Sequence, residues 1–192
     1  MCNYAILLAC LIGLRSGELS ALRWENIDDD FIHVVIAERR FNYDDHSEIV
    51  IGEPKNRKHR HIPITEDIRA LLDQIRSLNM DGDGWVFVNK DGKRHTGHDI
   101  SCAVDRRAKE SGLKKCSTHE IRRTVSSYLN TVLDRRTVAN LLGHLPETNE
   151  KYYDYDISST QDKLSALSKL VKSEKVIDFE SYTQTKKSEK AR

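Results

Sequence analysis

Most strand-like residues of this chain fall in one block, and that grouping limits the folds it can form. Leucines and isoleucines recur at helical spacing in residues 4–24, and Gly13 and Gly17 divide this stretch into two helical pieces that meet near Arg15. Strand-like runs follow within residues 31–64, and helical patterns then resume. One block of strands among helices predicts a mainly helical α+β domain with a small antiparallel β-sheet.

Three short runs make up the strand block: residues 31–37, 48–53 and 59–64. The first run alternates and is rich in β-branched residues, and the last places Ile62 and Ile64 on one face. Residues 54–58 join the second and third runs and carry three basic side chains. The pattern therefore predicts that these two runs form a hairpin with a basic tip.

Amphipathic helices are predicted after the strands, with Thr65 as the N-cap of the first and Gly143 at the end of the fourth. Their ranges are 66–78, 96–111, 118–131, 134–142 and 158–171. The remainder is polar with a basic end, although residues 176–179 could add a strand to a sheet edge. We therefore expect one domain over residues 1–172 and a polar C-terminal tail over residues 173–192.

The composition excludes several classes of protein. Apolar residues make up 38% and charged residues 32% of the chain, which is typical of a soluble globular protein and not of a disordered one. No apolar run approaches the roughly 18 residues of a membrane span, so we expect an intracellular protein with no membrane partner. No CxxC pair occurs, so reduced thiols are expected at Cys2, Cys10, Cys102 and Cys116.

The formal net charge is only +1, but the charges are unevenly distributed. Residues 53–61 carry four Lys or Arg against one acid, and residues 105–123 are also basic. Acidic residues gather at 25–30 and 44–48. Such a two-faced distribution suits a protein that lays one side on the phosphates of a nucleic acid.

Arg15 lies between two glycines in the segment GLRSGEL. Its planar guanidinium matches a phosphate in bidentate geometry, which makes it a candidate phosphate ligand. The alternative is a surface ion pair with Glu18, three residues on, worth only a few tenths of a kcal/mol. This segment alone favours the ion pair.

His119 and Arg122 form a second candidate pair in the segment HEIRR. Residues three apart share a helix face, so these two side chains should project together, while Ile121 points toward the core and Arg123 turns away. The pair could bind a phosphate and transfer a proton. The alternative is a satisfied histidine beside a solvated arginine, which the segment alone favours.

His144 follows Gly143, which should end a helix, so its ring is free to face a site. Tyrosines cluster shortly afterwards, at Tyr152, Tyr153 and Tyr155. A tyrosine cluster more often packs than reacts, because a buried phenol usually only satisfies its hydroxyl.

Taken together, the segments GLRSGELSALRW, PKNRKHRHIPI, HEIRRT and LLGH, in this order, resemble the tyrosine recombinase family, the phage and transposon integrases, over residues 5–155. The resemblance implies a catalytic set of Arg15, Lys55, His119, Arg122, His144 and Tyr153. It makes Glu18 a supporting acid, and Tyr152 and Tyr155 alternatives to Tyr153, which the spacing from His144 favours. It also implies DNA-binding roles at Arg57, Lys58, Arg60 and Arg123. The first three of these residues are in addition alternatives to Lys55.

The resemblance further implies that Tyr153 attacks a DNA phosphate, giving a 3′-phosphotyrosyl link and a free 5′-hydroxyl. Lys55 would protonate the leaving oxygen, His119 would accept or steer the phenol proton, and His144 would bind a phosphate oxygen. A free tyrosine has a pKa of about 10, so nearby guanidiniums and imidazoles must favour the phenolate. The phosphotyrosine keeps the energy of the broken bond, so no metal, ATP or other cofactor is expected.

The implied function is site-specific recombination that integrates or excises a phage, transposon or other mobile element. The implied partners are double-stranded DNA attachment sites, further protomers up to a tetramer on paired sites, and accessory directionality proteins, in the cytoplasm and nucleoid of a bacterial host. Counterparts of the family's N-terminal core-binding and arm-binding domains are missing here, which predicts weak, salt-sensitive DNA binding. Residues 158–171 resemble the family's terminal helix, which either docks on a neighbouring protomer or folds back on its own domain.

Two alternatives to recombination remain. A type IB topoisomerase-like enzyme would use the same chemistry to relax supercoils, although the GLRSGEL and LLGH segments argue against it. A non-catalytic DNA-binding remnant of a truncated integrase is the other. The pairs His59 with His61 and His95 with His98 lack the further ligands of a metal site, and residues 81–84 are explained by a turn, so no metal is expected.

Overall fold

The computed structural model describes residues 1–54, 57–78, 83–143 and 160–172. Its helices and strands, in chain order, are α1 (Cys2–Ile12), α2 (Ser16–Ser20), the 3-10 turn η1 (Trp24–Asn26), β1 (Phe31–Val34), β2 (Ala37–Asn42), β3 (Ser47–Gly52), β4 (Arg60–Pro63), α3 (Glu66–Leu78), α4 (Gly97–Glu110), α5 (Thr118–Leu129), α6 (Arg135–Leu142) and α7 (Thr160–Lys172). The predicted tail, residues 173–192, lies outside the described residues.

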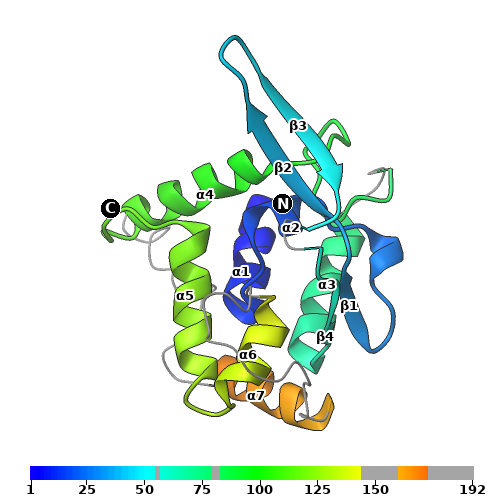
Figure 1. The fold of residues 1–192 in the computed structure, drawn as a ribbon, viewed down its shortest axis with the longest axis vertical. Coiled ribbons are helices and arrows are strands. Elements are labelled where there is room, and N and C mark those ends of the chain that lie inside the picture. The colour runs from blue at the N-terminus through cyan, green and yellow to red at the C-terminus, as the bar shows by residue number, and fades with distance from the viewer. Residues whose placement is uncertain (55–56, 79–82, 144–159, 173–192) are drawn as a thin grey trace, which may run out of the picture.

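Helix α1 is the centre of the domain, and α3, α4, α5 and α7 all contact it (Figure 1). Its sequence, CNYAILLACLI, is apolar almost all round, and a helix of that kind is stable only when neighbours cover it. Helix α7 packs on α1, α5 and β4 of its own chain, with Leu167 only 1% exposed. The described part of the terminal helix therefore folds back on its own domain.

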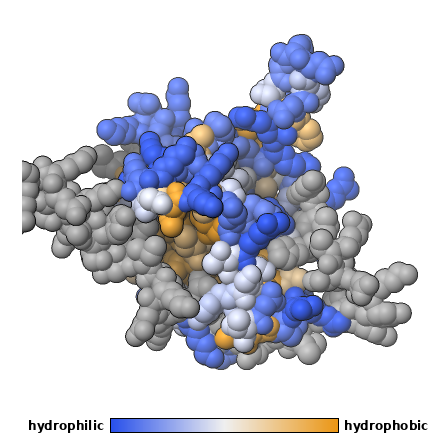
Figure 2. Space-filling view, turned by 90° about the vertical axis from the view of Figure 1, so that its left-hand side faces the viewer, coloured by the Kyte–Doolittle hydropathy of each residue, from blue (hydrophilic) through white to orange (hydrophobic). Residues whose placement is uncertain are grey.

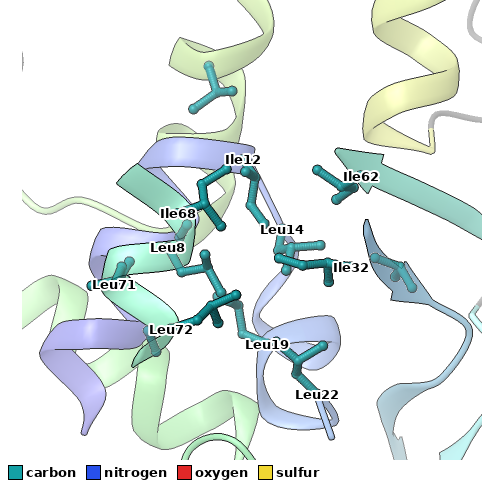
Figure 3. Packing of buried hydrophobic residues seen from close by; sticks show 14 of the residues in the cluster. Leu8, Ile12, Leu14, Leu19, Leu22, Ile32, Ile62, Ile68, Leu71 and Leu72 are labelled. Atoms are coloured by element: carbon teal, nitrogen blue, oxygen red, sulfur yellow. The ribbon is translucent and has the colours of Figure 1, made fainter. Parts of the chain in front are cut away.

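The hydrophobic core joins the helices to the inner strands (Figure 3). Leu8 and Ile12 of α1 meet Ile68 of α3 on one side of this core, and Ile32 and Ile62 of β1 and β4 approach from the other. Each is at most 1% exposed. Full burial of one such side chain contributes about 1.5–3 kcal/mol, so this cluster holds the strands against the helices.

The strands form two antiparallel pairs, β1 with β4 and β2 with β3. The small antiparallel sheet is confirmed, but the predicted pairing of the second and third strand runs is wrong. Strands β2 and β3 form an arm that projects beyond the helices (Figure 1) and turns at residues 43–46, where the Tyr43 N–H donates to the His46 carbonyl at 2.8 Å. The hairpin tip therefore carries Asp44 and Asp45 and is acidic, not basic.

The basic segment lies instead at a break between the two strand pairs. Val34 faces Arg60 and Ala37 faces Gly52, so residues 35–36 on the outgoing limb stand opposite the longer stretch 53–59 on the returning limb. The two strand pairs are therefore not one continuous ladder. The predicted Lys55 lies outside the described residues.

The helix boundaries follow their capping residues, and the predicted roles of Thr65 and Gly143 are confirmed. Helix α3 covers the predicted range, and the Ile68 N–H donates to Thr65 Oγ1 at 3.3 Å. Ser117 caps α5 through a capping box, and Asp134 caps α6. Gly143 ends α6 in the left-handed region, with φ 68°. These caps fix where the two helices of the candidate site begin and end.

None of the helices in the described ranges is both long and apolar enough to cross a membrane. Figure 2 shows one face of the molecule, on which the described surface is mainly hydrophilic and a smaller hydrophobic area lies near the centre.

The core account predicts a clear contrast within α3. Leu72 is 1% exposed in the core and Leu78 is 56% exposed at the end of the same helix. Leu72→Ala should lower the free energy of unfolding by about 2–5 kcal/mol, because it removes buried contacts and leaves a cavity. Leu78→Ala, the matched control, should change it by less than about 0.5 kcal/mol. Urea unfolding measures both, and equal losses would contradict this core assignment.

Candidate active site

Arg15 is positioned by a glycine turn that brings α1 against α5 and α6. Gly13 ends α1 with φ 66°, a conformation that favours glycine. A Cβ on Gly13 would lie 2.9 Å from Leu142 Cδ2 and 3.2 Å from Val125 Cγ1. A side chain at this position would be strained by the positive φ and would crowd these helices, and Arg15 follows directly beyond the turn.

Glu18 is buried and binds Arg15 in two ways. The Arg15 N–H donates to Glu18 Oε2 at 2.9 Å, and Arg15 Nη1 donates to Glu18 Oε1 at 2.8 Å. Glu18 is only 3% exposed, whereas 41% of the Arg15 side chain is exposed. The ion pair that the local sequence favoured is therefore present, but it is not a surface pair, because Glu18 is buried inside the protein.

Arg60 completes the burial of Glu18 from strand β4. Its Nη2 donates to Glu18 Oε2 at 2.7 Å, its Nη1 donates to Oε1 at 3.0 Å, and its Nε donates to the Leu141 carbonyl at 3.0 Å. Arg60 is 7% exposed. The structure thus places Arg60 inside the protein and bound to protein atoms, whereas the family resemblance implied a DNA-binding role for it.

The electrostatics of Glu18 follow from these contacts. Burial by itself would raise the pKa of the Glu18 carboxyl, but the hydrogen bonds and charge of Arg60, followed by those of Arg15, lower it to about 2. Glu18 is therefore a carboxylate at neutral pH.

Arg122 lies deeper still, at 2% exposure. Its Nη1 donates to the Gly13 carbonyl at 2.7 Å, and its Nη2 donates to the Leu142 carbonyl. Burial, and then the nearby charge of Arg15, lower the pKa of this guanidinium. Such a buried cation is tolerated because its N–H groups are hydrogen-bonded.

The three arginines converge on the last turn of α6. Arg60 binds the carbonyl of Leu141 and Arg122 that of Leu142, while Arg15 Nη2 donates to the carbonyl of Gly143 at 2.8 Å. Terminal carbonyls of a helix have no partner within the helix and carry partial negative charge, so cations stabilise this end. Segments far apart in the sequence therefore meet directly before His144.

The other predicted residues divide into two groups. His119 and Arg123 are exposed on α5, so His119 does not share the burial of Arg122 despite lying on the same helix. Lys58 is half-buried, and 88% of the Arg57 side chain is exposed. Outside the described residues lie Lys55, His144 and Tyr153, together with the alternatives Tyr152 and Tyr155.

A cavity of about 540 Å³ lies beside the arginine network, between the inner strands and the end of α6. Arg60, His61 and Gly143 are among its lining residues. His61 Nδ1 lies 2.6 Å from Nδ1 of His33, whose Nε2 lies 2.7 Å from Asp28 Oδ2. Within the described ranges, no group of three or more His, Cys, Asp or Glu is arranged to hold a metal ion.

Sequence reasoning missed the internal role of Arg60, although one signal for it was present. Side chains two residues apart on a strand lie on the same face. Arg60 therefore shares the inward face of β4 with Ile62, which is fully buried. Nothing in the sequence indicates that Arg60 binds the Leu141 carbonyl or that Arg122 binds the Gly13 carbonyl.

A sequence model of the phage integrase family matches residues 2–156. Because the match covers most of the 192 residues, the chain belongs to the phage integrase family. The tyrosine recombinase resemblance predicted from the motifs is thereby confirmed.

Curated relatives include two proteins named tyrosine recombinase XerC. The one from Xanthomonas axonopodis pv. citri is 27% identical over 146 residues, which cover 74% of this chain and 43% of the relative. The one from Corynebacterium glutamicum is 28% identical over 148 residues, covering 74% of this chain and 42% of the relative. The chain thus spans less than half the length of these relatives.

Solved structures of similar fold include the Tn1549 transposon integrase bound to transposon right end DNA, with a TM-score of 0.63, 20% identity and coverage of 88% of this chain and 58% of that one. XerA recombinase has a TM-score of 0.59 and 24% identity, with coverage of 88% of this chain and 56% of that one. The lambda integrase catalytic core has a TM-score of 0.56 and 18% identity, with coverage of 76% of this chain and 84% of that one. These likenesses confirm the predicted fold class, that of a tyrosine recombinase catalytic domain.

The Glu18 contacts predict a specific pH dependence of stability. A carboxyl whose pKa is lowered on folding stabilises the fold fully above its unfolded pKa of about 4.3, and loses that contribution as pH falls toward the folded value of about 2. Glu18→Gln should therefore lower the free energy of unfolding at pH 7, and the gap to the unsubstituted chain should narrow between pH 4.3 and pH 2.

Urea unfolding at a series of pH values measures this gap. Glu48→Gln, on the exposed arm, is the matched control and should leave the unfolding free energy at pH 7 nearly unchanged. If the difference in unfolding free energy between the unsubstituted chain and Glu18→Gln stays constant down to pH 2, Arg60 and Arg15 do not lower the pKa of Glu18 as described.

Proposed function

We propose that this chain is the catalytic part of a site-specific DNA recombinase, which cuts and rejoins a phosphodiester through a tyrosine. The observation that carries the proposal is the convergence of Arg15 and Arg122 on the turn that precedes His144. Family membership supports it.

The charge of the network suits a phosphate in its transition state. Arg15, Arg60 and Arg122 carry three positive charges against the single negative charge of Glu18, which leaves a net charge of +2 on these four side chains. Arg15 is the most exposed member, and its planar fork can donate to a phosphate oxygen. Fixed cations at this position stabilise the charge that develops as phosphorus becomes five-coordinate.

In the proposed reaction the phenol oxygen of Tyr153 forms a bond to the scissile phosphorus, and its proton passes to His119. The bond from phosphorus to the 5′ oxygen breaks, and that oxygen takes a proton from Lys55. His144 and Arg15 hold the non-bridging oxygens. A second 5′-hydroxyl then attacks the 3′-phosphotyrosine in reverse, so the cycle requires neither ATP nor a metal.

The proposed partners are double-stranded attachment sites and further protomers. Lambda integrase has been described as a dimer bound to a core site and as a tetramer bound to a Holliday junction, and the Tn1549 integrase in complex with circular intermediate DNA. We extend this kind of assembly to the present chain, together with accessory directionality proteins, in the cytoplasm and nucleoid of a bacterial host.

The proposal predicts a covalent protein–DNA adduct. The protein should give a denaturant-stable adduct with a nicked duplex that carries its attachment site, because the nick lets the leaving strand diffuse away and traps the phosphotyrosine. Chelation of divalent metals should not reduce the yield. Tyr153→Phe should abolish the adduct, whereas Tyr152→Phe and Tyr155→Phe should retain it, as resolved by denaturing gel electrophoresis.

The other outcomes contradict parts of the proposal. DNA binding without any adduct would identify a non-catalytic remnant. An adduct that disappears in Tyr152→Phe or Tyr155→Phe would move the nucleophile. Relaxation of supercoiled plasmid without strand exchange between two sites would indicate the topoisomerase-like reaction.

A further inference from the structure

We infer that Arg60 is a positioning residue of this active site: it holds the Glu18 carboxylate that orients Arg15, and it fixes the end of α6. The inference rests on the proposed function and adds a residue to it. Arg60 acts through other groups, because the residue is only 7% exposed and its guanidinium is bound to protein atoms.

The carboxylate of Glu18 is shared between two arginines. Oε1 accepts from Arg15 Nη1 at 2.8 Å and from Arg60 Nη1 at 3.0 Å. Oε2 accepts from the Arg15 N–H at 2.9 Å and from Arg60 Nη2 at 2.7 Å. A carboxylate offers about four acceptor positions, so these bonds saturate it and fix its orientation.

This sharing keeps Arg15 electrostatically available. A single carboxylate opposite a single guanidinium would neutralise it, whereas here one negative charge serves both Arg15 and Arg60. Arg15, Arg60 and Arg122 together with Glu18 carry a net charge of +2, and loss of the Arg60 charge would lower it to +1. A phosphate in the transition state would then be stabilised less.

Arg60 also shapes the end of α6. Its Nε binds the Leu141 carbonyl, and its guanidinium fills the space beside Gly143, where a Cβ would lie 2.8 Å from Arg60 Nη1. Gly143 is therefore required both for its positive φ and for the room that Arg60 occupies. Arg60 therefore fixes the position of Gly143, which directly precedes His144 in the sequence.

Lysine cannot perform this task. The Arg60 fork donates to both oxygens of Glu18 while its Nε reaches α6, so one planar group connects β4, α2 and α6. A lysine ammonium is a point charge on a flexible stem and cannot make the same set of bonds.

The test measures adduct formation under single-turnover conditions at saturating attachment-site DNA, together with the DNA dissociation constant. Arg60→Met should slow the cleavage rate at least tenfold and change the dissociation constant less than twofold, because the buried side chain does not touch DNA. Arg60→Lys should also cleave at least threefold more slowly than the unsubstituted protein. The Arg60→Lys variant retains the positive charge, and it keeps the test decisive if Arg60→Met fails to fold.

Arg69→Met is the matched control. Arg69 also binds backbone carbonyls, those of Asp28 and Asp29, but it lies on α3 away from the network. It should leave the cleavage rate unchanged. Unsubstituted protein that forms no adduct would refute the proposed function. If the unsubstituted protein is active, the role of Arg60 would be overturned by Arg60→Lys cleaving at the full rate. It would also be overturned if the cleavage rate and the DNA dissociation constant changed by the same factor.

Discussion

One buried carboxylate connects the parts of this domain that form the candidate active site. Glu18 accepts hydrogen bonds from Arg15, which precedes the short helix α2 as its N-cap, and from Arg60, on a strand that comes much later in the chain. Burying a lone carboxylate would be costly, and hydrogen bonds to the two guanidiniums offset part of that cost. The same pairing holds Arg15 at the surface, where 41% of its side chain remains exposed to a ligand.

The end of α6 is the second half of this arrangement. Its last carbonyls receive Arg15, Arg60 and Arg122, so the helix terminus is a fixed point to which β4, α5 and the α1–α2 turn are all attached. Gly13 and Gly143 make the approach possible, because each lacks the Cβ that would collide with a neighbour. The same contacts therefore join these elements and place Arg15 in the proposed active site.

The helices could be predicted from the sequence, whereas the strand pairing could not. Capping residues such as Thr65 are local signals, and α3 covers its predicted range. The arm was missed because Arg39 and Arg40 continue the strand without apolar alternation: a ribbon with solvent on both faces shows no burial pattern. The ion pair of Arg60 with Glu18 depends on a tertiary contact, which no local pattern indicates, although the inward face that Arg60 shares with Ile62 was readable.

The most direct test of this account is a crystal structure of the Tyr153→Phe protein bound to its attachment-site DNA. We expect a non-bridging oxygen of the scissile phosphate within hydrogen-bond distance of Arg15 Nη1 or Nη2, with Glu18 still held between Arg15 and Arg60. A scissile phosphate bound elsewhere, or a Glu18 carboxylate released from Arg60 while Arg15 binds the phosphate, would contradict the central claim that this shared carboxylate sets the phosphate-binding arginine.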